Sequence, residues 1–82
     1  MVLQAARQWV ADLRRRRPEI IRVGLFGSYV RDEYAPGSDL DVLIEVARTE
    51  HVRRADRADD YLPDAFPVAM DLFVYTSAEV AR

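Results

Sequence analysis

The sequence contains a candidate catalytic motif. It consists of two aspartates separated by one residue, with a glycine and a serine upstream. Gly27-Ser28 is followed, after ten intervening residues, by Asp39-Leu40-Asp41. Alternate side chains of a strand point to the same face, so Asp39 and Asp41 would project together with roughly 6 to 7 Å between their Cα atoms. Two like charges this close repel each other unless a cation lies between them. Carboxylate oxygens suit Mg²⁺, which also takes substrate phosphates and water as ligands, so the pair predicts metal-assisted phosphoryl transfer.

The residues around this pair could complete such a site. Gly27 would let a triphosphate approach the backbone closely. Ser28 is expected to cap a short helix that extends through Tyr34, and the free amides at the start of this helix would face an anion. Asp71 stands inside the apolar run Val68 to Tyr75, where a carboxylate lowers strand propensity and must be partly desolvated. A metal ion or an attacking hydroxyl would explain it, with Asp71 as a ligand of a second ion or as general base.

Each of these signals also has a purely structural explanation. Gly27-Ser28 can be an ordinary turn, and Asp-x-Asp at a strand start can be a solvated edge. Asp71 can pair with an arginine, and Arg31 can form a surface ion pair instead of binding phosphate. His51 lies in a polar stretch and is expected to be exposed. The joint occurrence of the signals in one suitable topology favours the functional interpretation.

The hydrophobic periodicity predicts the helices and strands on which these residues lie. Apolar residues at helical spacing from Val2 to Leu13 indicate an amphipathic helix, and Pro18 ends it. Alternation of Leu40, Val42 and Ile44 with polar neighbours indicates a half-buried strand. We expect helices over about 2–16 and 49–62, strands over about 20–26, 39–46 and 68–75, the short helix from Ser28, a turn over 35–38, and a last helix introduced by the capping-box pattern of 76–79.

This element order predicts one α/β (α+β) domain over residues 1–82. Its three-stranded sheet is flanked by helices in the order α-β-α-β-α-β-α. The link between the first two strands is short for a right-handed parallel crossover, so we expect these strands to be antiparallel and the sheet to be mixed. Gly27-Ser28, at the end of the first strand, would then lie beside Asp39 and Asp41 at the start of the second.

Composition narrows the class of protein. The 82 residues have a formal net charge of −2, and this lack of a basic surplus argues against a general nucleic-acid binder. There is no cysteine, so any metal must be held by oxygen or by the lone His51. No apolar run has the length of a membrane span and no signal-peptide pattern is seen at the N-terminus, which predicts a cytoplasmic location.

The central block of the sequence resembles a known family. The run Gly-Leu-Phe-Gly-Ser-Tyr-Val-Arg-Asp-Glu-Tyr-Ala-Pro-Gly-Ser-Asp-Leu-Asp-Val-Leu-Ile-Glu-Val, with the later Met-Asp-Leu-Phe-Val, is similar to the minimal nucleotidyltransferases of the DNA polymerase beta superfamily. These are antitoxin-type proteins usually encoded beside a HEPN-domain toxin. The resemblance implies the nucleotidyltransferase fold and Mg²⁺-dependent transfer of a nucleotide, AMP from ATP, to an acceptor. In some members the acceptor is a tyrosine of the HEPN toxin.

The resemblance also implies roles for individual residues. Gly27, Ser28 and Arg31 would bind the nucleotide, and Asp39, Asp41 and Asp71 would be the catalytic and metal-binding carboxylates. Tyr29 and Asp32 depart from the family pattern, where a basic residue and a glycine are frequent, and would weaken nucleotide affinity.

Three functional hypotheses follow from these observations. The first is an enzyme that modifies a protein partner, and the second is a non-catalytic antitoxin that neutralises its toxin by binding alone. The third, an enzyme acting on a small molecule or an RNA end, is disfavoured because relatives with those activities need extra domains. Association of two copies of the chain stays open.

Overall fold

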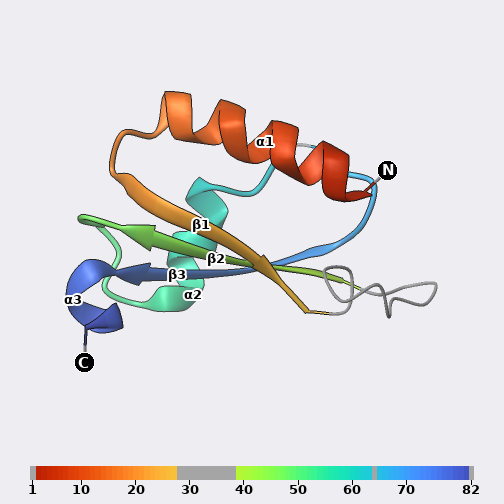
Figure 1. Cartoon of the computed structure of the whole chain (residues 1–82). Helices are drawn as coiled ribbons and strands as arrows, with labels where there is room; N and C mark the ends of the chain where they lie inside the picture. Colours follow the sequence, from red (N-terminus) through yellow and green to blue (C-terminus); the bar gives the residue numbers. More distant parts are fainter. Residues whose placement is uncertain (1, 28–38, 64, 82) are drawn as a thin grey trace.

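The computed structural model describes residues 2–27, 39–63 and 65–81. Over these ranges the helices and strands follow one another in the predicted order. The three strands form one sheet (Figure 1). In chain order they are α1 (Val2–Arg16), β1 (Ile20–Phe26), β2 (Leu40–Val46), α2 (Arg54–Arg57), the 3₁₀ helix η1 (Ala58–Asp60), β3 (Met70–Thr76) and α3 (Ser77–Val80). The short helix expected from Ser28 and the turn expected over 35–38 lie outside the described residues.

The sheet is mixed, as the sequence predicts. Its strand order is β1-β2-β3, with β1 antiparallel to β2 and β3 parallel to β2. Parallel neighbours need a long connection, and the chain between β2 and β3 supplies one that contains α2 and η1. The end of β1 and the starts of β2 and β3 therefore lie at the same end of the sheet, with β2 in the middle (Figure 1).

The two faces of the sheet differ sharply in burial. Leu40, Val42, Ile44 and Val46 of β2 are fully buried and pack in one core with α1, which contributes residues at helical spacing. The complete buried core is Ala6, Trp9, Leu13, Ile20, Leu40, Val42, Ile44, Val46, Tyr61 and Val74. The other face, which carries Asp41, Leu43 and Glu45 of β2, is open to solvent around Leu43, which is 38% exposed, whereas Glu45 is buried at 8%.

The helix expected over residues 49–62 is wrong in length. The α-helix covers only Arg54–Arg57 and continues as the 3₁₀ turn Ala58–Asp60. The helical spacing of Val52, Ala55, Ala58 and Leu62 suggested a longer helix. Val52 at its start and Leu62 at its end are 91% and 45% exposed, so neither is buried in the core. Without a buried stripe, a charged segment gains little from extending its helix.

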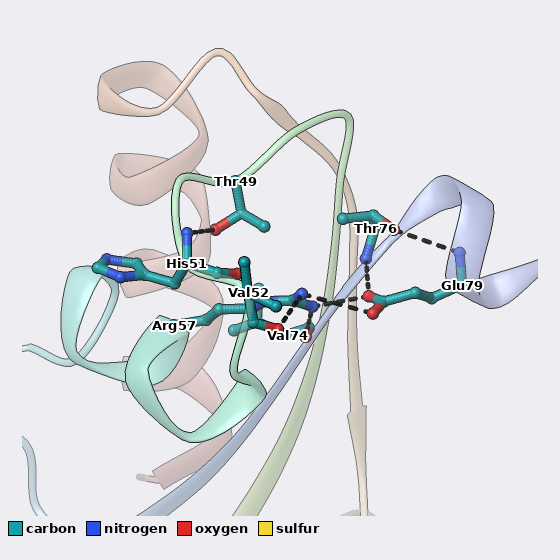
Figure 2. Close-up of polar contacts among 7 residues, drawn as sticks. All are labelled: Thr49, His51, Val52, Arg57, Val74, Thr76 and Glu79. Atoms are coloured by element: carbon teal, nitrogen blue, oxygen red, sulfur yellow. Dashed lines mark hydrogen bonds and ion pairs between the residues drawn. The ribbon is translucent and has the colours of Figure 1, made fainter.

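A buried arginine organises the end of the sheet where β3 stops (Figure 2). Arg57 is only 4% exposed and its guanidinium donates to three backbone carbonyls, those of His51 at 2.8 Å, Val52 at 3.0 Å and Val74 at 3.2 Å. The same group forms an ion pair with Glu79, with 2.6 Å between Nη1 and Oε1. One side chain thus joins the loop before α2 to β3 and α3.

The predicted capping box of the last helix is confirmed. The Thr76 hydroxyl accepts from the Glu79 backbone N–H at 3.2 Å, and the Glu79 carboxylate accepts from the Thr76 N–H at 2.8 Å. The hydrogen bond from Arg57, helped by the Thr76 amide, lowers the pKa of Glu79 to about 2. Glu79 therefore stays ionised in its ion pair over the whole neutral range.

Candidate active site

Two of the predicted carboxylates stand directly opposite each other on neighbouring strands. Asp41 of β2 is in register with Asp71 of β3. Because these strands are parallel and about 4.8 Å apart, side chains in register project from the same face. This is the open face, since Leu40 and Val42 on either side of Asp41 point into the core. Like charges in such a position are destabilising, so the pair needs a compensating cation or a proton.

Asp39 lies one residue before β2 and is exposed. The start of β2 is fixed beside β3 by a hydrogen bond from the Leu40 N–H to the Ala69 carbonyl at 2.9 Å. Over residues 2–27, 39–63 and 65–81, no group of three or more histidine, cysteine, aspartate and glutamate side chains is arranged to hold a metal ion. The structure thus brings Asp41 and Asp71 together, whereas convergence of Asp39 on the same point stays a prediction.

Gly27 closes against Asp41 from the end of β1. Its φ of 89° lies in the left-handed region, and a Cβ placed on it would come within 2.1 Å of the Asp41 Oδ2 atom. Only glycine combines this φ with such a close approach. Phe26, Asp41 and Asp71 are in register across one end of the sheet, and Gly27, directly after Phe26, lies against the Asp41 side chain; Gly27, Asp41 and Asp71 are here called the row. Ser28 and Arg31, the other predicted nucleotide-binding residues, lie outside the described residues.

The alternative in which an arginine neutralises Asp71 finds no support among the described side chains. The ion pairs that their arginines make go to Asp12, Glu45, Asp56 and Glu79. None of these pairs involves the row at the end of the sheet. A divalent cation would supply positive charge to the Asp41–Asp71 pair.

The open face holds residues that the sequence did not single out. Phe26, Leu43 and Phe73 are 44, 38 and 40% exposed, and the rings of the two phenylalanines lie 5.8 Å apart. Farther along the strands, Arg22 donates to the Glu45 carboxylate at 2.8 Å and lowers the pKa of that group. The alternation of the strands already placed Leu43 with Asp41 and Phe73 with Asp71, and this signal could have identified the apolar surface.

A polar cleft of about 400 Å³ lies at the opposite end of the sheet. Its side chains largely satisfy one another: the Tyr61 hydroxyl donates to Glu19 at 2.7 Å, and His51 Nε2 lies 3.0 Å from Asp60 Oδ2. His51 is thus half-buried and paired, contrary to the expected exposed position. The residues lining the cleft are Arg17, Glu19, Arg48, Thr49, Glu50, His51, Asp60 and Tyr61. It shares no residue with the row at the other end.

Comparison with known proteins identifies a family. The chain matches the family described as "Nucleotidyltransferase domain" over residues 6–82. Two relatives from Methanocaldococcus jannaschii are each named "Putative protein adenylyltransferase". One is 29% identical over 72 residues, which cover 79% of this chain and 74% of the relative. The other is 31% identical over 55 residues, which cover 67% of this chain and 64% of the relative.

A solved structure shares the fold. The crystal structure of "a putative nucleotidyltransferase from Sulfolobus solfataricus" superposes with a TM-score of 0.70 at 24% identity, and the match covers 99% of this chain and 72% of that chain. Within the described part of the present chain, none of the helices has the length and apolar character needed to cross a bilayer.

Proposed function

The protein belongs to the nucleotidyltransferase domain family, and we propose that it transfers the AMP moiety of ATP to a hydroxyl of an acceptor protein. The observation that carries the proposal is the row of Gly27, Asp41 and Asp71 at one end of the sheet. The backbone of Gly27 lies there beside the carboxylates of Asp41 and Asp71. None of the described arginines forms an ion pair with either carboxylate. The relatives named as protein adenylyltransferases support a protein as the acceptor.

The proposed site residues have different roles in the reaction. The triphosphate lies against the backbone of Gly27 and Ser28, next to the Asp41 carboxylate that the missing Cβ of Gly27 accommodates, and Arg31 adds positive charge. The acceptor oxygen forms a bond to the α-phosphorus while the bond to the bridging oxygen breaks, and pyrophosphate leaves with that electron pair. Asp71, exposed at the edge of the row, takes the proton of the acceptor hydroxyl.

Magnesium is part of the proposal, with Asp39, Asp41 and Asp71 as its ligands. The donor type fits, because carboxylates are hard oxygen ligands and Asp41 and Asp71 are in register. The described residues hold no complete three-carboxylate group, so phosphate oxygens and water must complete the coordination. When bound, the ion would neutralise charge on the phosphates and on the carboxylate pair.

The acceptor we propose is a HEPN-domain toxin, in keeping with the resemblance of the central sequence block. The protein would then act as an antitoxin that silences its partner by adenylylation in the cytoplasm, where Mg-ATP is abundant. The open face leaves the row accessible to a macromolecule, because Asp71 and the neighbouring Phe73 are both exposed.

One observation favours a second candidate, a non-catalytic antitoxin that neutralises by binding alone. The absence of a complete metal-binding group among the described residues is what a binding module would show. Two like charges in register weigh against it, because they destabilise a surface that has no need of them.

Transfer of label from α-³²P-ATP to the HEPN protein separates the two candidates. We expect labelling of the partner by the wild type with Mg²⁺, and loss of labelling of at least about 100-fold for Asp71→Asn. Asp59→Asn removes the same charge from an exposed position in η1 and should label normally. Equal neutralisation of the toxin by wild type and Asp71→Asn, without labelling by either, would establish the binding-only function.

A further inference from the structure

An exposed apolar surface adjoins the two carboxylates on the open face. It consists of Phe26, Leu43 and Phe73, here called the apolar platform, and each side chain is at least 38% exposed. Leu43 and Phe73 are in register with each other and lie two residues beyond Asp41 and Asp71 on the same strands. They are therefore about 7 Å from the carboxylate positions along the strands and on the same face.

The platform is continuous and open above its centre. The rings of Phe26 and Phe73 are tilted against each other at 5.8 Å, which bridges β1 and β3 across β2. Gly24, in register with Leu43, contributes no side chain, and a Cβ placed there would meet nothing within 4 Å. Exposed aromatic surface of this kind next to a reaction centre favours binding of another apolar group.

The geometry of the reaction indicates which substrate reaches the platform. In phosphoryl transfer the attacking and leaving oxygens lie roughly in line with the phosphorus. With the triphosphate against Gly27, which directly follows β1, pyrophosphate leaves over the β1 side of the row. The acceptor oxygen must then arrive from the β3 side, over Asp71. The side chain that follows Asp71 on that strand and that face is Phe73.

We propose that the apolar platform docks the acceptor protein, through a segment in which a bulky apolar side chain flanks the hydroxyl that is modified. This inference rests on the proposed transfer to a protein. The apolar side chain packs on Leu43 and Phe73, and this contact directs the neighbouring hydroxyl toward Asp71. The platform thus selects acceptors by the residue beside the hydroxyl.

A nucleobase is the other group that could stack on these rings, and the structure disfavours it. Selection of a base needs hydrogen bonds to its edge, and the charged groups nearest along the strands, Arg22 and Glu45, are already paired with each other. Phe73 also lies on β3, which β2 separates from β1, the strand that leads to Gly27 and the triphosphate.

Backbone amide NMR of the ¹⁵N-labelled full chain tests the proposal with defined probes. Acetyl-Ser-Phe-amide and acetyl-Ser-Gly-amide share the hydroxyl and differ only in the flanking side chain. We expect the phenylalanine peptide to shift the amide resonances of Gly24, Leu43 and Phe73, and the glycine peptide to leave them in place. Phe73→Ser should weaken the response by about tenfold, because it removes one ring of an aromatic pair and its apolar contact area.

Leu62→Ser serves as the matched control, since Leu62 is 45% exposed and lies outside the sheet. Its response to the phenylalanine peptide should equal that of the wild type. Equal responses to the two peptides, or no shift at the platform with either, would overturn the proposal. Shifts at Leu43 and Phe73 with adenosine would overturn it as well, by assigning the platform to the nucleobase.

Mg-ATP titrated alone keeps this test separate from that of the proposed function. Shifts at Gly27 and Asp41 with Mg-ATP are expected from the proposed transfer reaction. Their absence would refute nucleotide binding, whereas their presence together with a silent platform would refute only acceptor docking.

Discussion

Replacing Asp71 with asparagine should stabilise the protein in the absence of magnesium. Asp71 is exposed and stands in register with the half-buried Asp41, so the folded state holds two negative charges that the unfolded chain separates. Asparagine keeps the size and shape of the side chain and removes one charge. A residue that serves stability alone would give the opposite result, because most substitutions destabilise.

The size of the effect follows from the spacing of the strands. Two unit charges about 5 Å apart repel by about 1 kcal/mol when solvent screens them as in water, and by about 3 kcal/mol at an effective dielectric constant near 20. The exposure of Asp71 places the pair near the lower value, which also agrees with measured cross-strand charge effects. A gain of about 1 kcal/mol raises the melting temperature of a domain of this size by about 4 to 8 °C.

Magnesium should reverse the order of stability. At a concentration of about ten times its dissociation constant, an ion that binds only the folded protein stabilises it by about 1.4 kcal/mol. The wild type should therefore gain several degrees in melting temperature, and Asp71→Asn should gain little because it loses a charged ligand.

Thermal unfolding followed by circular dichroism measures both effects, in EDTA and in MgCl₂ with ionic strength matched by NaCl. Asp59→Asn controls for the change in net charge. The reasoning is refuted if Asp71→Asn melts below the wild type in EDTA, or if MgCl₂ shifts both proteins equally.

Three further outcomes are expected from the described contacts. Gly27→Ala should destabilise the protein by more than about 1 kcal/mol and abolish the magnesium response, because a Cβ at φ 89° would displace the Asp41 carboxylate; an unchanged melting curve would contradict the observed conformation. Arg57→Met should lower the free energy of unfolding by about 3 kcal/mol in urea titrations, since it leaves the Glu79 carboxylate and three carbonyls without their donor. Because the pKa of Glu79 is lowered from 4.5 to about 2, its ion pair stabilises the protein above about pH 4.5 and this contribution is lost as pH falls toward 2; Glu79→Gln should flatten the dependence in that window, and equal slopes would argue against the ion pair.

The sheet could be predicted from the sequence because its signals are local. The alternation along β2 identifies the buried face residue by residue, and Leu40, Val42, Ile44 and Val46 are all fully buried. The short link between the first two strands was enough to predict their antiparallel pairing. The segment 49–62 gave a misleading signal, because four apolar residues at helical spacing describe a helix only when they also find a surface to pack on.

The register of β3 could not be read from the sequence. It depends on how the crossover through α2 and η1 delivers the chain to β2, and a shift by one residue would turn Asp71 into the core. Sequence spacing linked Asp39 with Asp41, whereas the closest structural relation is between Asp41 and Asp71. Alternation along the strands could place Leu43 with Asp41 and Phe73 with Asp71, but not the contact between Phe26 and Phe73, which come from strands that do not pair with each other.

The two ends of the sheet use their charges in opposite ways, and this contrast supports a functional interpretation of the Gly27 end. At the far end, opposite charges meet: the guanidinium of Arg57 is buried against the Glu79 carboxylate and three carbonyls. At the Gly27 end, like charges are placed in register beside a position that only glycine can fill. Local choices that lower stability are expected at functional sites, because the rest of the fold compensates for them. A substrate or ion that restores electroneutrality at Asp41 and Asp71 would remove this conflict, so binding there gains free energy that a neutral surface could not provide.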